Sequence, residues 1–251
     1  MTRSPIYVAL DVPTADDALA IAKALAPPSM GGELGFKVGL ELYLREGIGI
    51  VQRLQTLCAA PVFVDLKLHD IPATVERASA NLVHQGVRFF NVHAQGGPEM
   101  MQGARAGATK ALSNMGSSET VTIIAVTLLT SLSASVLASH LKITDSPTDY
   151  AVHLAQASQA AGLDGVVCSP LEVAAIRQAL GPQACLVTPG IRPAESDSGA
   201  RKDDQQRIAT PQQALANGAS MLVIGRPITQ AADPLAAAQR ILDSLKTPAT
   251  C

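Results

Sequence analysis

Three charged residues, Asp65, Lys67 and Asp70, lie within six positions directly after the apolar run Val62-Phe63-Val64. Alternate side chains of a β-strand share a face, so Asp65 and Lys67 are predicted to point the same way. A buried charge destabilises a protein unless it is paired, and pairing rarely compensates fully for the lost hydration. A segment under selection for stability alone would carry Val or Ile here. We therefore interpret the pattern as a cationic proton donor held between two carboxylates, with a structural salt bridge as the alternative.

The composition favours a soluble enzyme. The chain has 251 residues, of which 47% are hydrophobic and 16% are charged, enough to bury one α/β barrel or two small domains. A net charge of −2, 3% aromatic residues and no Trp argue against a nucleic-acid partner. No apolar run is long enough to span a membrane, and the first residues lack the apolar core of a signal peptide. The four cysteines show no C-x-x-C spacing, and these features together predict a cytoplasmic protein without a membrane partner.

Short apolar runs rich in β-branched residues alternate with Ala- and Leu-rich stretches. The runs are residues 6–12, 34–40, 62–68, 89–94, 121–129, 165–169, 185–189 and 221–225. Near-continuous apolar runs are typical of parallel strands covered on both faces. Eight such runs, each followed by a predicted helix, indicate an α/β protein with a (β/α)8 TIM barrel that forms a single domain over residues 1–251. An open doubly wound sheet is the alternative, although it usually needs fewer strands.

Capping signals mark some of the predicted helices. Ser169-Pro170-Leu171-Glu172 has the form of a capping box with Pro at the first helical position, and Thr210-Pro211 begins a second segment of the same kind. We therefore predict that helices begin at Pro170 and at Pro211.

Polar residues recur where the predicted strands end, which is where TIM barrels carry their chemistry. They are Asp11 in the first run, Lys37 in the second, Asp65, Lys67 and Asp70 in or after the third, His93 in the fourth, Thr130 after the fifth, Arg192 after the seventh and Arg226 after the eighth. Each is a weak signal alone, because a single Asp or Thr at a strand end often caps a helix. Two Lys and three Asp around one mouth predict a charged site. No second His or carboxylate lies at ligand spacing from His93, so we expect a neutral, packed ring rather than a metal ligand.

The ends of the seventh and eighth strands predict a phosphate site, because the corresponding loops bind phosphate in many TIM barrels. Gly225 allows the backbone N–H to approach an anion closely, and Arg226 can form a bidentate charged contact. A surface salt bridge is the alternative for Arg226. Arg192 begins a polar stretch, residues 192–206, with the composition of a surface loop. We interpret this stretch as a lid that can close over the mouth, with an exposed linker as the alternative.

Residues 65–74, Asp-Leu-Lys-Leu-His-Asp-Ile-Pro-Ala-Thr, resemble the active-site signature of the orotidine 5'-phosphate decarboxylase family. The resemblance covers nearly the whole chain, because residues 9–11, 36–39, 125–131, 165–169, 187–193 and 223–227 follow in the family's order. The D-x-K-x-x-D core is shared with sugar-phosphate enzymes on the same barrel, whereas Thr-Pro-Gly-Ile-Arg and Ile-Gly-Arg-Pro make the match specific. The stretch after Arg192 is longer than the family pattern, so either Gln205 or Gln206 aligns with its phosphate ligand, and Gln205 fits better.

The resemblance implies decarboxylation of orotidine 5'-monophosphate to UMP, the final step of de novo pyrimidine nucleotide synthesis, without a metal or an organic cofactor. It assigns Lys67 as the proton donor to the C6 carbanion, oriented by Asp65 and Asp70, with Lys37 paired to Asp65. The substrate-binding residues that it implies are Asp11 and Lys37 at the ribose, Thr130 at the pyrimidine, Arg192, Gln205, Gly225 and Arg226 at the phosphate, and Asp65 and Pro189. It also implies a homodimer with shared sites, in which Asp70, Ile71 and Thr74 reach into the partner's site.

Two other functions stay open from the sequence. One is a Mg²⁺-dependent sugar-phosphate decarboxylase or aldolase-type lyase on the same barrel, in which Asp65 and Asp70 help to hold the metal. The other is a barrel that binds a phosphorylated metabolite without turnover.

Overall fold

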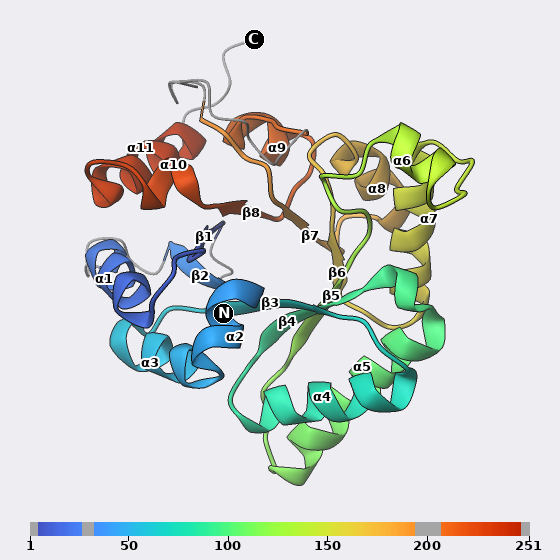
Figure 1. Cartoon of the computed structure of the whole chain (residues 1–251), viewed down its shortest axis with the longest axis horizontal. Coiled ribbons are helices and arrows are strands. Elements are labelled where there is room, and N and C mark those ends of the chain that lie inside the picture. The colour runs from blue at the N-terminus through green and yellow to red at the C-terminus, as the bar shows by residue number, and fades with distance from the viewer. Residues whose placement is uncertain (1–4, 27–32, 194–206, 247–251) are drawn as a thin grey trace.

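A computed structural model describes residues 5–26, 33–193 and 207–246, and these ranges form a closed parallel barrel (Figure 1). The strands pair in sequence order, and β1 closes the barrel against β8 through the pairs Ile6 with Leu222 and Val8 with Ile224. The strands are β1 (Ile6–Ala9), β2 (Leu34–Gly39), β3 (Val62–Leu68), β4 (Phe89–His93), β5 (Thr122–Val126), β6 (Gly165–Val167), β7 (Cys185–Thr188) and β8 (Met221–Ile224). The (β/α)8 prediction is confirmed, and the open-sheet alternative is wrong because the first and last strands are paired.

The helices surround the strands as an outer ring, as Figure 1 shows. They are α1 (Ala15–Leu25), α2 (Leu40–Glu46), α3 (Gly49–Cys58), α4 (Pro72–His84), α5 (Pro98–Asn114), α6 (Ala134–Ser139), α7 (Pro147–Ala160), α8 (Val173–Leu180), α9 (Pro211–Ala216), α10 (Arg226–Thr229) and α11 (Pro234–Lys246). Over the described residues, no helix is long and apolar enough to cross a bilayer.

The two predicted helix starts differ in outcome. α9 begins at Pro211, and the Thr210 hydroxyl accepts a hydrogen bond from the Gln213 N–H at 3.3 Å, as the capping signal predicted. α8 begins at Val173, so the predicted start at Pro170 is wrong. Glu172 accepts the Ser169 N–H at 3.2 Å, but the Ser169 hydroxyl accepts from Leu171. Only half of the capping box forms, and the residues between make a turn instead of a first helical turn.

The N-terminal end of the barrel interior is filled by aromatic side chains. Phe63 and Phe89 stack with ring centroids 4.3 Å apart, and Tyr7 meets Phe89 edge-on at 5.5 Å. We call these three side chains the aromatic plug. They belong to a buried cluster inside the barrel, separate from the larger core between the strands and the helices. The plug lies below the polar end of the barrel, and Phe63 also lines the cavity at that end.

Strand β3 departs from regular pairing near its C-terminal end. The four residue steps from Val64 to Leu68 match only the two steps from Phe90 to Val92 on β4. Within this bulge Lys67 has a φ of 52°, in the left-handed region that disfavours residues with a Cβ. The simple alternation that we used to predict the directions of Asp65 and Lys67 is therefore interrupted here, and the bulge sets the direction of both side chains.

Candidate active site

A cavity of about 590 Å³ opens at the C-terminal end of the barrel. The predicted site residues that line it are Asp11, Lys37, Asp65, Lys67, Thr130, Pro189, Arg192, Gly225 and Arg226. Gln205, Gln206 and most of the predicted lid lie outside the described residues. The cavity thus gathers polar residues from the ends of β1, β2, β3, β5, β7 and β8, where the barrel rule predicted them.

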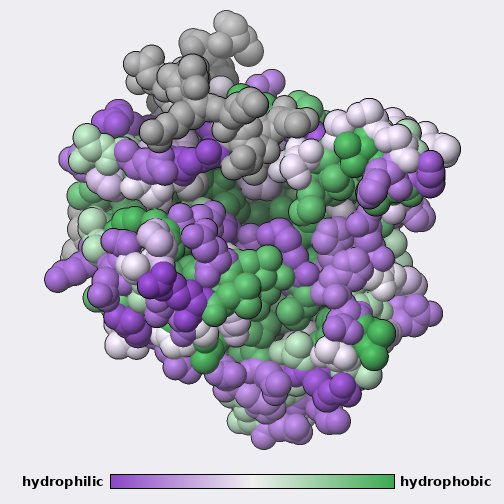
Figure 2. Space-filling model, in the orientation of Figure 1, coloured by the Kyte–Doolittle hydropathy of each residue, from purple (hydrophilic) through white to green (hydrophobic). Residues whose placement is uncertain are grey.

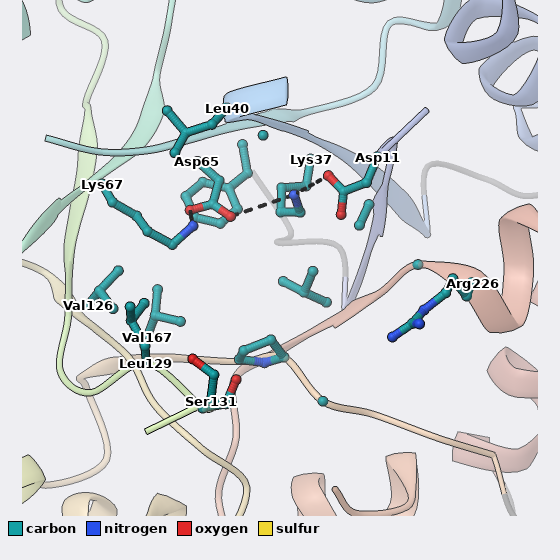
Figure 3. Close-up of a pocket in the computed structure, with 18 of the residues that line it drawn as sticks. Asp11, Lys37, Leu40, Asp65, Lys67, Val126, Leu129, Ser131, Val167 and Arg226 are labelled. Atoms are coloured by element: carbon teal, nitrogen blue, oxygen red, sulfur yellow. Dashed lines mark hydrogen bonds and ion pairs between the residues drawn. The ribbon is translucent and has the colours of Figure 1, made fainter. Parts of the chain in front are cut away.

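Four charged side chains form an alternating array along one wall of the cavity (Figure 3). Lys37 Nζ lies 2.9 Å from Asp11 Oδ1 and 3.6 Å from Asp65 Oδ2, and Lys67 Nζ lies 2.8 Å from Asp65 Oδ1. The side chains of Lys37 and Asp65 are only 7% and 14% exposed, whereas that of Lys67 is 31% exposed at the cavity surface. Both lysines line the cavity, the Lys67 ammonium is the more exposed of the two, and the Asp65 carboxylate is largely buried between them.

The buried carboxylate of Asp65 is held in its charged form. Burial alone would raise its pKa, but the charges of Lys37 and Lys67, with hydrogen bonds from Lys67 and Asn91, outweigh that effect and lower the pKa below its ordinary value. The electrostatic consequence is a fixed negative charge against which Lys67 is oriented.

Asn91 is a member of this site that the sequence analysis missed. It is fully buried on β4, accepts a hydrogen bond from the Lys67 N–H at 2.8 Å and donates one to Asp65 Oδ1 at 2.7 Å. The available signal was an Asn in the otherwise apolar run Phe89-Phe90-Asn91-Val92, because a buried amide requires partners.

His93 is packed at the end of β4, as expected from the sequence. Its ring is 8% exposed, stacks on His69 with centroids 5.2 Å apart, and has no hydrogen-bond partner at Nδ1 among the described residues. Burial, followed by the charges of His69 and Lys67, lowers the pKa of His93 to about 4. The ring is therefore neutral at pH 7. In the same described ranges, no group of three or more His, Cys, Asp or Glu side chains is arranged to hold a metal ion.

Asp70, Ile71 and Thr74 do not line the cavity of their own chain. The Asp70 carboxylate accepts a hydrogen bond from the Ile71 N–H at 2.6 Å, and Asp70 and Ile71 are exposed just before α4 begins. The interpretation of Lys67 as held between two carboxylates therefore fits Asp65 but not Asp70 within a single chain.

Arg226 lies across the cavity from the charged array, as Figure 3 shows. It is the first residue of α10, directly after Gly225 at the end of β8. Arg192 lies at the exit of β7, where its guanidinium donates to the Ile191 carbonyl at 2.9 Å. A ligand that contacts both the array and Arg226 must span the mouth of the barrel.

Comparison with known proteins identifies the relatives of this chain. Residues 4–241 match the sequence model of the "Orotidine 5'-phosphate decarboxylase / HUMPS family". The chain belongs to this family. Proteins named orotidine 5'-phosphate decarboxylase are 48% identical over 240 residues in Chromobacterium violaceum, covering 96% of this chain and 91% of that protein, and 46% identical over 241 residues in Nitrosococcus oceani, covering 96% and 97%.

Solved structures of the family agree with the fold. The orotidine 5'-phosphate decarboxylase of Lactobacillus acidophilus superposes with a TM-score of 0.82 at 34% identity, covering 98% of this chain and 100% of that one. An uncharacterised conserved protein from Geobacillus kaustophilus gives 0.80 at 37% identity, covering 96% and 100%. The family resemblance drawn from residues 65–74 and the later segments is confirmed.

Proposed function

We propose that this chain decarboxylates orotidine 5'-monophosphate to UMP as a single barrel domain, without a metal or an organic cofactor, in the final step of de novo pyrimidine nucleotide synthesis. The observation that carries the proposal is the array Asp11–Lys37–Asp65–Lys67, which ends with the Lys67 ammonium at the cavity surface. The names of the relatives support the substrate.

The array fits the chemical demand of the reaction. Loss of CO₂ from C6 of the pyrimidine leaves a carbanion without an electron sink, so the protein must stabilise that charge with groups already in place. The Lys67 ammonium provides a positive charge beside C6 and then the proton that completes UMP. Because the negative charge on C6 develops only in the transition state, this contact raises kcat more than it tightens substrate binding. Asp65 orients Lys67, and its negative charge faces the departing carboxylate.

The remaining cavity residues bind the parts of the substrate that do not react. Asp11 and Lys37 hold ribose hydroxyls, Thr130 contacts the pyrimidine, and Pro189 lines the site between them. Arg192, Gln205, Gly225 and Arg226 bind the phosphate. Binding energy from this remote group helps to organise the reacting end of the site.

A homodimer with shared sites completes the proposal. Asp70, Ile71 and Thr74 lie at the junction between β3 and α4. Ile71 is 66% exposed. Leu40 and Leu44 on α2 are 46% and 79% exposed, and Figure 2 shows hydrophobic residues gathered over α2 beside the mouth. Such an apolar rim fits a subunit interface across which each chain supplies Asp70 to its partner.

Mixed dimers test the shared site. Lys67→Ala and Asp70→Ala homodimers should each be nearly inactive. Equal mixing with subunit exchange gives one intact site in each mixed dimer, so roughly a quarter of wild-type activity should return. Exchange is verified by native mass spectrometry of differently labelled chains. No recovery after verified exchange places Asp70 in its own chain's site and overturns the shared-site arrangement.

The direct test of the reaction is the loss of orotidine 5'-monophosphate absorbance, followed with and without excess chelator. Equal turnover in both samples is expected. Turnover abolished by chelator and restored by Mg²⁺ would favour the metal-dependent lyase. Tight binding of orotidine 5'-monophosphate without turnover would favour the binding protein.

A further inference from the structure

The side chain of Asn91 forms hydrogen bonds both to the Lys67 backbone and to the Asp65 carboxylate. Its amide oxygen accepts the backbone N–H of Lys67 at 2.8 Å, and its amide nitrogen donates to Asp65 Oδ1 at 2.7 Å. The residue is 0% exposed and is not among those that line the cavity. Asn91 can therefore act on a ligand only through Asp65 and Lys67.

The bulge in β3 explains why a side chain is needed at this position. Between Val64 and Leu68 the strand loses its regular register with β4, so the Lys67 N–H has no ladder partner and bonds to the Asn91 side chain instead. A left-handed φ for a residue with a Cβ is maintained only where surrounding contacts enforce it. The hydrogen bond from Asn91 is one such contact, and it acts at the residue whose ammonium reaches the cavity.

The second bond of Asn91 sets the rotation of the Asp65 carboxylate. Asp65 Oδ1 accepts from both Lys67 Nζ and Asn91 Nδ2, whereas Oδ2 faces Lys37 at 3.6 Å. With both carboxylate oxygens engaged from β2, β3 and β4, the carboxylate plane has one arrangement that satisfies all three partners.

The Asn91 amide meets both requirements of this position. A backbone N–H needs an acceptor and a carboxylate oxygen needs a donor, which also fixes the orientation of the amide. Asp at position 91 would place a second carboxylate against Asp65, and Leu would leave the Lys67 N–H buried without a partner.

We propose that Asn91 is a positioning residue of the reacting centre, which holds the Lys67 backbone in its left-handed conformation and fixes the Asp65 carboxylate so that the Lys67 ammonium is aimed at the substrate. The role in turnover rests on the proposed decarboxylation, whereas the effect on Asp65 does not.

The first test measures the titration of the Asp65 carboxyl group directly and needs no substrate. The charged and titratable groups that face Asp65 and its partner are Lys37 from β2, Lys67 from β3, Asp11 behind Lys37, and the His69–His93 pair near Lys67. Asn91→Ala leaves these in place and removes one hydrogen bond that favours the ionised carboxylate. The ¹³C carboxyl resonance of Asp65, assigned with Asp65→Asn, should titrate at higher pH in Asn91→Ala than in the wild type. An unchanged titration overturns the proposal.

The second test separates positioning from general stability. Asn91→Ala should lower kcat on orotidine 5'-monophosphate by roughly 10–100-fold, the size expected for loss of a hydrogen bond to a charged group, with little change in KM. The acid limb of its kcat/KM profile should move to higher pH. Ile123→Val, a cavity-forming change at a fully buried position on β5, serves as the control and should move neither quantity.

The outcomes distinguish this proposal from the proposed function. Absence of turnover in the wild type refutes the decarboxylase, and the Asp65 titration still decides the role of Asn91. Wild-type kcat and pH profile in a folded Asn91→Ala protein refute the positioning role. Equal losses in Asn91→Ala and Ile123→Val assign the loss to stability and also refute it.

Discussion

At the N-terminal end of the barrel interior, Tyr7, Phe63 and Phe89 pack ring against ring. At the C-terminal end, Asp11, Lys37, Asp65 and Lys67 form a chain of charges that begins at the exposed Asp11, passes through the largely buried Lys37 and Asp65, and ends at the half-buried Lys67. β3 supplies Phe63 to the plug and Asp65 and Lys67 to the array, so one strand serves both regions and the difference does not come from the backbone architecture. The plug removes apolar surface from water, which stabilises the fold, whereas the array keeps charges where hydration is poor, which does not. The comparison assigns stability to the N-terminal end of the barrel interior and chemistry to its C-terminal end.

Lys67→Ala is expected to reduce turnover more than any other change at the mouth of the barrel. Turnover should fall by at least about 1,000-fold because the variant loses both the charge beside C6 and the proton donor, while affinity for UMP should be largely retained. The measurements are single-turnover kinetics and UMP titration of the purified variant. A kcat near that of the wild type would remove Lys67 from the reaction, and substrate trapped on the protein by borohydride would assign it a Schiff base instead.

Arg226→Ala should have the next largest effect. It tests whether the side of the mouth opposite the charged array binds the phosphate. The loss of a charged phosphate contact should lower kcat/KM for orotidine 5'-monophosphate by about 10–100-fold, equivalent to about 1.5–3 kcal/mol. Orotidine, which lacks the phosphate, should be affected far less. Arg53→Ala on α3, where Arg53 pairs with Asp16 at the surface, is the control. Equal losses for both substrates in Arg226→Ala would show that Arg226 does not bind phosphate.

Phe89→Leu tests how much the aromatic plug at the N-terminal end of the barrel contributes to stability. The change keeps an apolar side chain but breaks the ring stacking of the plug, so the free energy of unfolding should fall by about 1 kcal/mol and Tm by about 2–4 °C. The kcat measured well below Tm should match the wild type. Thermal unfolding and steady-state assays on the same preparation check both. A selective loss of kcat would mean that the plug also positions the array.

His93→Asn tests the buried ring at the C-terminal end of β4, and its expected effect is confined to acid pH. The pKa of His93 is about 4 in the folded protein against an ordinary value of 6.5, so the unfolded chain binds its proton first as the pH falls. Stability from the neutral ring is present above pH 6.5 and is lost as the pH falls towards 4. The variant should lose less stability than the wild type over this interval. Urea midpoints across it provide the measurement, and parallel curves would contradict the prediction.

The barrel and most of the mouth were predictable because they follow from general rules that relate sequence patterns to structure. Buried parallel strands need continuous apolar runs, and strand ends collect at one mouth, which brought Asp11, Lys37 and Arg226 together from distant parts of the sequence. The residues 65–74 carried the family resemblance that the comparisons confirmed.

The rest depended on local geometry that no such rule contains. The bulge that gives Lys67 its positive φ comes from the register between β3 and β4, and a single strand sequence does not encode its partner's register. For the same reason Asn91 could be recognised as polar but not assigned to Asp65. The start of α8 was misplaced because Ser169 bonds to Leu171 rather than completing the capping box.

Closure of the barrel by β1 and β8 has a consequence for how the protein acquires activity during synthesis. The charged array is encoded in the first 67 residues, but Arg226 follows the last strand as the first residue of α10, and Ile6 pairs with Leu222 only when the two ends of the sequence meet. Contacts of such long sequence separation carry a high loop-closure entropy and form late. A ribosome-bound chain that still lacks β8 has the proton donor without the opposing arginine. Catalytic competence therefore cannot precede closure of the barrel, and incomplete chains are expected to be inert.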